Sequence, residues 1–226
     1  MNTRENWNLE YSHINSIPSS SRTEPAHGLV KIKDLCVVNE ESKKILDLGC
    51  GNGRNAIHLL GHGFEVECID FSDEALSIFK SKLITEPQDK LRITCADITQ
   101  GLPYNNDEFN FVLDSYCHCH FTEFEKWNYI LSEIIRVLKK GGKLVSIQLS
   151  TEDTYYKSKK KTGFEGGFIS QDDINGFEKI HMSDINYEQQ LSKFGLTVSS
   201  QHVKFEDTVS GIIYVRDVVI YCAEKK

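Results

Sequence analysis

The chain has 226 residues, a length that fits one α/β domain with a small cap and leaves no room for a second full domain. Its hydrophobic share of 39% and its charged share of 26% are typical of a folded globular protein and exclude a disordered one. The formal net charge of -7 argues against nucleic acid as a partner, because domains that bind polyanions usually carry a basic excess or a basic face.

No segment of the sequence predicts export or membrane insertion. The N-terminus lacks the apolar core of a signal peptide, and no run reaches the roughly 20 apolar residues that cross a bilayer. The seven cysteines are odd in number and lie mostly in apolar stretches, which indicates reduced thiols. We therefore expect a cytoplasmic protein that does not contact a membrane.

The first part of the chain has no strand pattern. Residues 1–28 show little hydrophobic periodicity and contain Pro18 and Pro25, so we expect them to lie outside a central sheet. Residues 29–38 predict a short helix that leads to a strand at 44–49.

Residues 45–54 carry the most informative pattern, Ile-Leu-Asp-Leu-Gly-Cys-Gly-Asn-Gly-Arg. It predicts a strand, a turn with glycine at alternate positions, and the start of a helix at 54–62. Glycine is required where φ is positive or where a Cβ would touch a ligand, so the turn predicts a main chain that lies against a cofactor. A dinucleotide fingerprint, G-x-G-x-x-G, would need glycine at position 54, where this chain has arginine.

With an aspartate two residues before the first glycine, the pattern is D-x-G-x-G-x-G. This pattern resembles the first motif of the class I methyltransferases that use S-adenosylmethionine. The resemblance implies S-adenosylmethionine as the cofactor, bound by this motif. The implied contact residues are Asp47, Gly49, Cys50, Gly51 and Gly53.

Two further acidic residues follow in the order of the family's motifs. The strand after the glycine helix ends at Asp70, whose carboxylate could accept hydrogen bonds from both ribose hydroxyls. The next strand is followed by Asp97 and Ile98. The resemblance implies that Asp70 and Phe71 contact the cofactor and that Asp97 and Ile98 lie at its adenine. Asp97 could instead cap a helix or a turn.

The segment after the fourth predicted strand should lie beside the transferred methyl group, because ligands of open α/β sheets bind beyond the carboxyl ends of the strands. Asp114 could contact the cofactor's ammonium or a substrate amine, or could be structural. His118 and His120 are the best candidates for a base, since an unperturbed imidazole titrates at about pH 6.5, but either could cap a helix or pack in the core. Tyr116 is expected to contact the acceptor. Cys-His-Cys-His at 117–120 lacks the second ligand pair typical of zinc sites, so we expect no metal.

The predicted elements alternate between strand and helix, which demands parallel strands with right-handed crossovers. They are strands at 64–69, 91–95, 109–114, 143–150, 196–205 and 212–222, and helices at 73–83, 123–139 and 187–194. At 136–143 the sequence resembles the family's Leu-Lys-Pro-Gly-Gly signature with Lys140 in place of proline, and Gly141 and Gly142 predict a helix end. The resemblance implies a three-layer αβα fold, doubly wound around a seven-stranded, mostly parallel sheet with one antiparallel C-terminal strand.

We expect one methyltransferase domain over residues 1–226. Its expected parts are an N-terminal lid at 1–28, a cofactor-binding half at 29–150, a glycine-rich substrate-side insertion after the fifth strand at 151–180, and a helix with a strand hairpin at 181–226.

The expected lid at 1–28 and the expected insertion at 151–180 supply the candidate contacts with the acceptor. Trp7 and Tyr11, four residues apart on one helical face, could cover the sulfonium or the acceptor. Arg22 could pair with a carboxylate or phosphate of the acceptor. Tyr155 and Phe168 could form the other wall. Packing within the lid and a surface arginine are the plainer alternatives.

Methyl transfer from a sulfonium is an in-line displacement, so the protein mainly supplies alignment, and a base is needed only for an acceptor that arrives protonated. The compact chain and its two inserted segments favour a small-molecule acceptor. One alternative is a macromolecular acceptor such as tRNA or a protein side chain, for which the lysine-rich run at 157–161 is the one hint. Another is a non-catalytic module that binds S-adenosylmethionine. The chain could act as a monomer or a homodimer.

Overall fold

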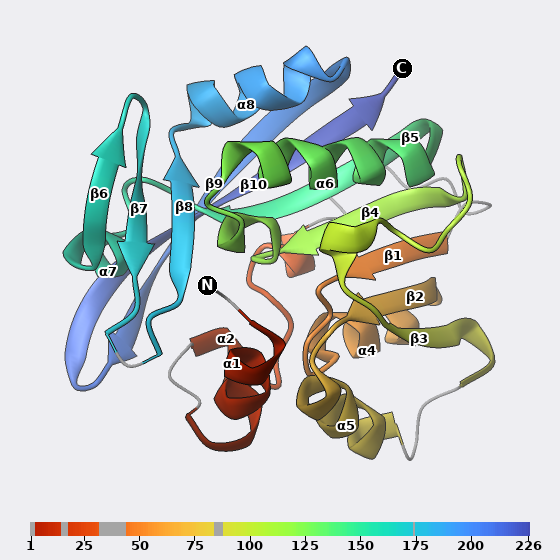
Figure 1. Ribbon diagram of the computed structural model, residues 1–226, viewed down its shortest axis with the longest axis horizontal. Helices are drawn as coiled ribbons and strands as arrows, with labels where there is room; N and C mark the ends of the chain where they lie inside the picture. Colours follow the sequence, from red (N-terminus) through yellow and green to blue (C-terminus); the bar gives the residue numbers. More distant parts are fainter. Residues whose placement is uncertain (1–2, 15–17, 32–43, 84–87, 174) are drawn as a thin grey trace.

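The central sheet has seven strands in the order β3-β2-β1-β4-β5-β10-β9, as seen in a computed structural model that describes residues 3–14, 18–31, 44–83, 88–173 and 175–226 (Figure 1). The strands are β1 (Lys44–Leu48), β2 (Glu65–Asp70), β3 (Leu91–Cys95), β4 (Phe109–Ser115), β5 (Leu138–Leu149), β9 (Leu196–Val209) and β10 (Ile212–Lys225). β10 runs antiparallel to both of its neighbours, and the other strands share one direction. The predicted mostly parallel sheet with one antiparallel C-terminal strand is therefore confirmed.

Helices cover both faces of this sheet. The longer ones are α4 (Arg54–Gly61), α5 (Asp73–Lys82), α6 (Phe124–Val137) and α8 (Asp184–Lys193). Successive residues of a strand point to opposite faces, so Ile45 packs in the core with α4 and α5, whereas its neighbour Leu46 packs in the core with α6 and α8. This doubly wound arrangement brings the carboxyl ends of the parallel strands to one edge of the sheet, where ligands of such sheets bind.

The remaining helical segments are short. They are α1 (Arg4–Leu9), η1 (Glu10–Ile14), α2 (Pro18–Ser21), η2 (Leu29–Lys31), η4 (Gln88–Lys90), η5 (Ile98–Gln100), η6 (His118–His120) and α7 (Thr154–Ser158). Of the helix predicted at 29–38, residues 29–31 form η2, and the rest lies outside the described residues. α1 and α2 lie outside the central sheet, as expected for the N-terminal segment (Figure 1). Within the described part of the chain, no helix has the length and apolar character needed to cross a membrane.

The junction between α6 and β5 differs from the prediction. α6 ends at Val137, two residues early, and β5 begins with the next residue. Gly141 has a φ of 74°, and a Cβ on Gly142 would lie 2.8 Å from the carbonyl oxygen of Lys139. The glycine pair therefore lies inside β5, where Gly141 supplies a positive φ and a Cβ on Gly142 would crowd the backbone, and does not terminate the helix.

The insertion is more ordered than the sequence suggests. Its strands β6 (Lys160–Phe164), β7 (Gly167–Gln171) and β8 (Glu178–Met182) form a second, antiparallel sheet. Within β7 only Phe168 and Ser170 are buried. Two buried positions are too few for a pattern of alternating buried and less buried residues to indicate a strand in the sequence. Figure 1 shows this sheet beside the N-terminal helices, so the N-terminal segment and the insertion at 151–180 lie next to each other.

Gly53 allows α4 to start against α5. Its φ is 76°, and a Cβ there would overlap the ring of Phe79. We expect Gly53→Ala to lower the free energy of unfolding by about 1–3 kcal/mol, because alanine disfavours a left-handed backbone and the ring must move. Chemical denaturation measures this change. Gly61→Ala, in the same helix and with no atom within 4 Å of its Cβ position, is the control and should be neutral or slightly stabilising. Equal losses for both variants would contradict the packing argument.

Candidate functional site

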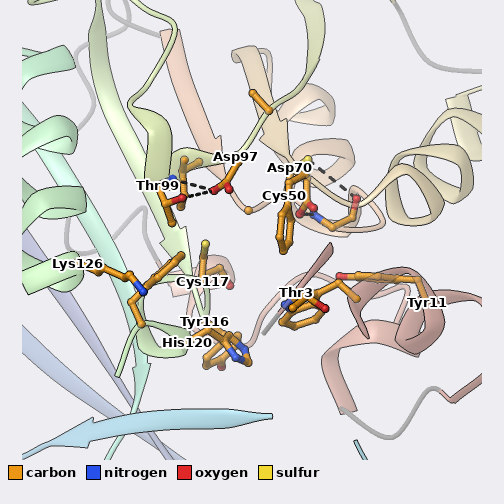
Figure 2. A pocket seen from close by; sticks show the side chains of 18 of the residues that line it. Thr3, Tyr11, Cys50, Asp70, Asp97, Thr99, Tyr116, Cys117, His120 and Lys126 are labelled. Carbon is orange, nitrogen blue, oxygen red and sulfur yellow. Dashed lines mark hydrogen bonds between the residues drawn. The ribbon is translucent and has the colours of Figure 1, made fainter. Parts of the chain in front are cut away.

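A cavity of about 370 Å³ opens at the carboxyl ends of the parallel strands. Figure 2 shows Asp70 and Asp97, from the tips of different strands, on one side of it and Tyr116 and His120 on another. Its volume is typical of small-molecule sites. The predicted site residues that line it are Trp7, Tyr11, Gly49, Cys50, Gly51, Asp70, Phe71, Asp97, Ile98, Tyr116 and His120. The predicted site residues that do not line it are Arg22, Asp47, Gly53, Asp114, His118, Tyr155 and Phe168.

The turn between β1 and α4 brings bare main chain to the cavity. Gly49 and Gly51 have φ values of 63° and 55°. A Cβ on Gly49 would overlap the side chain of Cys117, and a Cβ on Gly51 would overlap the hydroxyl of Tyr11. Gly53 does not line the cavity and its Cβ position faces α5, so its predicted contact with a cofactor stays a prediction. The first two glycines are thus required by close approach of other segments at the cavity itself.

Asp70, at the tip of β2, is fixed by the backbone on both sides. Its Oδ2 accepts a hydrogen bond from the N–H of Gly51 at 2.8 Å, and its Oδ1 accepts one from the N–H of Ser72 at 2.9 Å. Burial raises the pKa of this carboxyl group, and the two N–H donors oppose that rise. Each carboxylate oxygen can accept a second hydrogen bond. The side chain, 9% exposed, therefore retains capacity for two ligand hydroxyls.

Asp97 both caps a helical turn and lines the cavity. Its Oδ1 accepts hydrogen bonds from the N–H of Thr99 at 2.9 Å and from the Thr99 hydroxyl at 2.7 Å. The capping alternative is therefore correct for this oxygen. Ile98, the next residue, adds an apolar surface to the same wall.

Asp47 lies behind the glycine turn, not in the cavity. It is 1% exposed, and its Oδ2 has no hydrogen-bond partner among the described residues. Burial raises its pKa from the usual 3.8 to about 7; Arg54 lowers it, and the nearby Asp70 and Asp114 raise it further. The predicted direct contact between Asp47 and a cofactor is corrected, because the strand directs this side chain into the core.

Asp114 organises the segment after β4 from within the core. Its Oδ1 accepts hydrogen bonds from the N–H groups of Cys117 at 3.2 Å and His118 at 2.9 Å. Its Oδ2 accepts hydrogen bonds from the hydroxyl of Ser146 and the amide of Gln148, each at 2.7 Å. The predicted catalytic and cofactor-binding roles are corrected to a structural one, because the fully buried carboxylate is occupied by protein donors.

The two candidate bases point in opposite directions from η6. His118 stacks on Trp127 with ring centroids 4.2 Å apart, and its Nε2 lies 2.8 Å from the carbonyl oxygen of the same tryptophan. Its predicted catalytic role is corrected, since the ring is fully buried in the core. His120 lines the cavity, with its ring 4.9 Å from that of Trp7. Burial, and then the charge of Lys179, hold the pKa of His120 well below its usual range.

The N-terminal segment links the two walls of the cavity. Trp7 stacks on Phe177 of the insertion with centroids 4.5 Å apart. The side-chain oxygen of Asn8 accepts a hydrogen bond from the Ser72 hydroxyl at 2.8 Å, at the start of α5. Tyr11 lies over the glycine turn, and burial, with the charge of nearby Asp70, raises the pKa of its hydroxyl well above the usual value.

Tyr116 has an unusual backbone for a large residue. Its φ is 61°, and its N–H donates to the carbonyl of Ile147 at 3.1 Å, which holds the turn in place. Burial raises the pKa of its hydroxyl to about 12, so the group is neutral at physiological pH. Non-glycine residues with such φ values cluster at functional sites, where the surrounding structure holds the strain.

Three predicted acceptor contacts lie outside the main cavity. Arg22 forms an ion pair with Asp207 at 2.7 Å on β9. Tyr155 is buried among neighbouring tyrosines, and Phe168 stacks on His181 at 4.6 Å within the second sheet. The predicted contacts of Tyr155 and Phe168 with an acceptor in this cavity are corrected, because the insertion folds as a sheet and uses both rings for its own packing.

Sequence reasoning missed several residues of the cavity wall. Arg54, the first residue of α4, lines the cavity and is largely buried. Its position directly after the third glycine was a sufficient signal, because that helix start faces the ligand side of the sheet. Phe121 and Lys126 also line the cavity from the segment that leads into α6 and from its first turn. Nothing local distinguishes those two residues in the sequence.

The strand order, the glycine turn and the cavity at the strand ends define a Rossmann-like, cofactor-binding α/β protein. Residues 45–142 match the family described as "Methyltransferase domain". The demethylmenaquinone methyltransferase of Clavibacter sepedonicus is 34% identical over 109 residues, which cover 48% of this chain and 42% of that protein. The chain spans about half the length of the curated relatives that it matches.

Solved structures share the fold over most of the chain. A SAM-dependent methyltransferase of Methanosarcina mazei has a TM-score of 0.68 and 21% identity, covering 83% of this chain and 94% of its own. The 1,6-didemethyltoxoflavin-N1-methyltransferase of Burkholderia thailandensis, solved with 1,6-didemethyltoxoflavin and S-adenosylhomocysteine, has a TM-score of 0.70 and 13% identity over 99% of this chain and 87% of its own. The chain therefore shares the fold of these methyltransferases, and its residues 45–142 are similar in sequence to a methyltransferase domain.

The raised pKa of Asp47 predicts a pH-dependent stability. Because the folded state binds the proton more tightly than the unfolded state, this contribution is full below about pH 4 and is lost as the pH rises through about 7. Asp47→Asn removes the titration, so its stability relative to wild type should rise by more than about 1 kcal/mol between pH 5 and pH 8. Urea denaturation at both pH values measures this. The exposed Asp89→Asn is the control, and a pH-independent difference for Asp47→Asn would contradict the prediction.

Proposed function

We propose that this chain binds S-adenosylmethionine in the 370 Å³ cavity and catalyses methyl transfer to a small-molecule acceptor. The observation that carries the proposal is the Asp70 carboxylate, which the N–H groups of Gly51 and Ser72 hold at the cavity beside the glycine-rich turn. A fixed carboxylate with spare acceptor capacity is suited to the two hydroxyls of a ribose.

The cavity residues fit such a cofactor. Asp70 would hold the ribose, Gly49 and Gly51 would bring main chain against the amino-acid portion, and Asp97 with Ile98 would bound the adenine. The bound cofactor supplies an electrophilic methyl group. The chain's part is to align an acceptor with that methyl group and to exclude water.

Trp7, Tyr11 and Tyr116 provide aromatic walls for the acceptor side. His120 is the residue best positioned to take a proton from an acceptor that arrives protonated, because its ring lines the cavity and is neutral at physiological pH. An acceptor that arrives as an anion needs no base.

A small acceptor is favoured over a macromolecule. The lysine-rich run that hinted at nucleic acid is engaged with neighbouring acids: Lys157 pairs with Glu152 at 2.7 Å, and Lys159 pairs with Asp173. The named relatives, a demethylmenaquinone and a didemethyltoxoflavin methyltransferase, also act by name on small molecules. The cytoplasmic location, the four parts of the domain and the choice between monomer and homodimer stay predictions.

The role of Asp70 is tested by binding of S-adenosylhomocysteine. Calorimetry should detect binding to the wild type, with no response to NAD. Asp70→Ala should weaken that binding by about 1–3 kcal/mol, the scale of hydrogen bonds to a charged group. Asp89→Ala, which removes an exposed carboxylate outside the cavity, should leave the affinity unchanged. Wild-type protein that binds no S-adenosylhomocysteine, or an unaffected Asp70→Ala, would overturn the assignment. Release of S-adenosylhomocysteine from S-adenosylmethionine with a panel of small acids, phenols and amines then tests the transfer itself.

The glycine turn gives an independent test. Gly51→Val should abolish binding of S-adenosylhomocysteine, because its side chain would occupy the space of Tyr11 and of the ligand. Gly195→Val is a matched control, since Gly195 has a φ of 81° and no atom within 4 Å of its Cβ position. Both variants carry similar backbone strain, so equal affinity for the ligand would contradict the proposed place of the turn. Circular dichroism checks that each variant remains folded.

A further inference from the structure

A second, smaller cavity lies next to the first. Its volume is about 30 Å³, and it shares Arg54 and Tyr116 with the larger cavity. The rest of its wall comes from the N-terminal segment, the end of β5, α7, β8, β9 and β10. The small cavity therefore lies on the side of the site that the proposed function gives to the acceptor.

Positive side chains dominate this small cavity. Arg22, Arg54, Lys179 and Arg216 line it, and its lining includes no carboxylate side chain. Two of the cations form ion pairs with carboxylates that do not line the cavity. Arg216 donates to Asp153 at 2.8 Å and to Asp207 at 2.9 Å, and Arg22 donates to the same oxygen of Asp207 at 2.7 Å.

The other two cations are buried without a carboxylate partner. Arg54 is 8% exposed and its guanidinium donates to the carbonyl of Glu24 at 3.0 Å. Lys179 is 5% exposed and its ammonium donates to the hydroxyl of Tyr156 at 2.8 Å. Within the described ranges, no carboxylate oxygen comes within 4.0 Å of either cation. Burial lowers the pKa of Arg54, as expected for a desolvated cation.

Buried charges of one sign carry a desolvation cost unless a counter-charge compensates them. Proteins keep such groups where a ligand supplies the counter-charge, and arginine in particular matches a planar carboxylate with two parallel hydrogen bonds. The uncompensated pair here faces a cavity that holds only one or two water-sized groups. That room suits the two oxygens of a carboxylate but not a whole ring.

We propose that the small cavity binds a carboxylate of the methyl acceptor, between Arg54 and Lys179. This inference rests on the proposed function, because it makes the larger cavity the place of the acceptor's reacting atom. The remainder of the acceptor passes Tyr116, which belongs to both cavities. The hydroxyls of Tyr116 and Tyr156 lie on residues of the same wall and add hydrogen-bonding capacity.

The wild-type protein tests the carboxylate directly. Benzoate, the uncharged benzamide and phenyl phosphate serve as probes in calorimetry and thermal-shift titrations at low salt. We expect benzoate to bind at least about tenfold more tightly than benzamide, since the two share shape and differ in charge. Equal affinities, or no benzoate binding, would overturn the proposal. Tighter binding of phenyl phosphate than of benzoate would overturn the carboxylate assignment in favour of a phosphate.

A pair of lysine variants locates the site. Lys179→Met keeps the aliphatic length and removes the charge, and we expect it to lose at least about tenfold in benzoate affinity. Lys157→Met removes an exposed lysine that lines neither cavity, and its benzoate affinity should equal that of wild type. Unchanged benzoate affinity in Lys179→Met would overturn the proposal. If Lys179→Met does not fold, the comparison of benzoate with benzamide on wild type decides alone.

Binding of S-adenosylhomocysteine separates this inference from the proposed function. Lys179 does not line the larger cavity, so Lys179→Met should bind S-adenosylhomocysteine as wild type does. Benzoate binding that depends on Lys179, in a protein that binds no S-adenosylhomocysteine, would reject the proposed function and leave the anion site intact. If the protein binds S-adenosylhomocysteine but does not prefer benzoate over benzamide, the carboxylate site is rejected and the proposed function is retained.

Discussion

The absence of three Cβ atoms in the turn after β1 is the constraint on which the site depends. Each missing side chain leaves space that a different part of the chain fills: Cys117 after β4 at the first glycine, Tyr11 of the N-terminal segment at the second, and Phe79 of α5 at the third. The turn is therefore the point where strand, helix and lid converge. A side chain at any of the three positions would force one of these segments away.

Because three of the five residues in the turn are glycines, much of the cavity wall comes from distant parts of the sequence. The N-terminal segment reaches both the cofactor side, through Asn8 and Ser72, and the insertion, through the stack of Trp7 on Phe177. Asn175 of the insertion also donates to Glu10 at 2.8 Å. The N-terminal segment and the insertion are thus joined by direct contacts beside the cavity.

Cations line the smaller cavity and three carboxylates lie close together near the larger one, with Arg54 lining both. Asp47, Asp70 and Asp114 lie close enough below the larger cavity for their charges to interact, whereas Lys179 and Arg216 lie beside the smaller one. A cofactor with a positive sulfonium suits the acidic side, and an anionic acceptor suits the basic side. Since interactions between buried charges are weakly screened, this separation would orient the two ligands before they meet.

The sequence by itself determined the alternation of strands and helices in the central sheet and the glycine turn after β1, because these depend on local periodicity and on backbone angles that glycine allows. The antiparallel member of the sheet and the predicted role of Asp70 came from the resemblance to a known family. Only the tertiary structure decided which polar side chains face the cavity. His118 and His120 lie in the same helical turn. His118 packs on Trp127 in the core, whereas His120 lines the cavity. The second sheet, and with it Lys179, could not be predicted, since its pairing joins short strands whose register depends on contacts between segments remote in the chain.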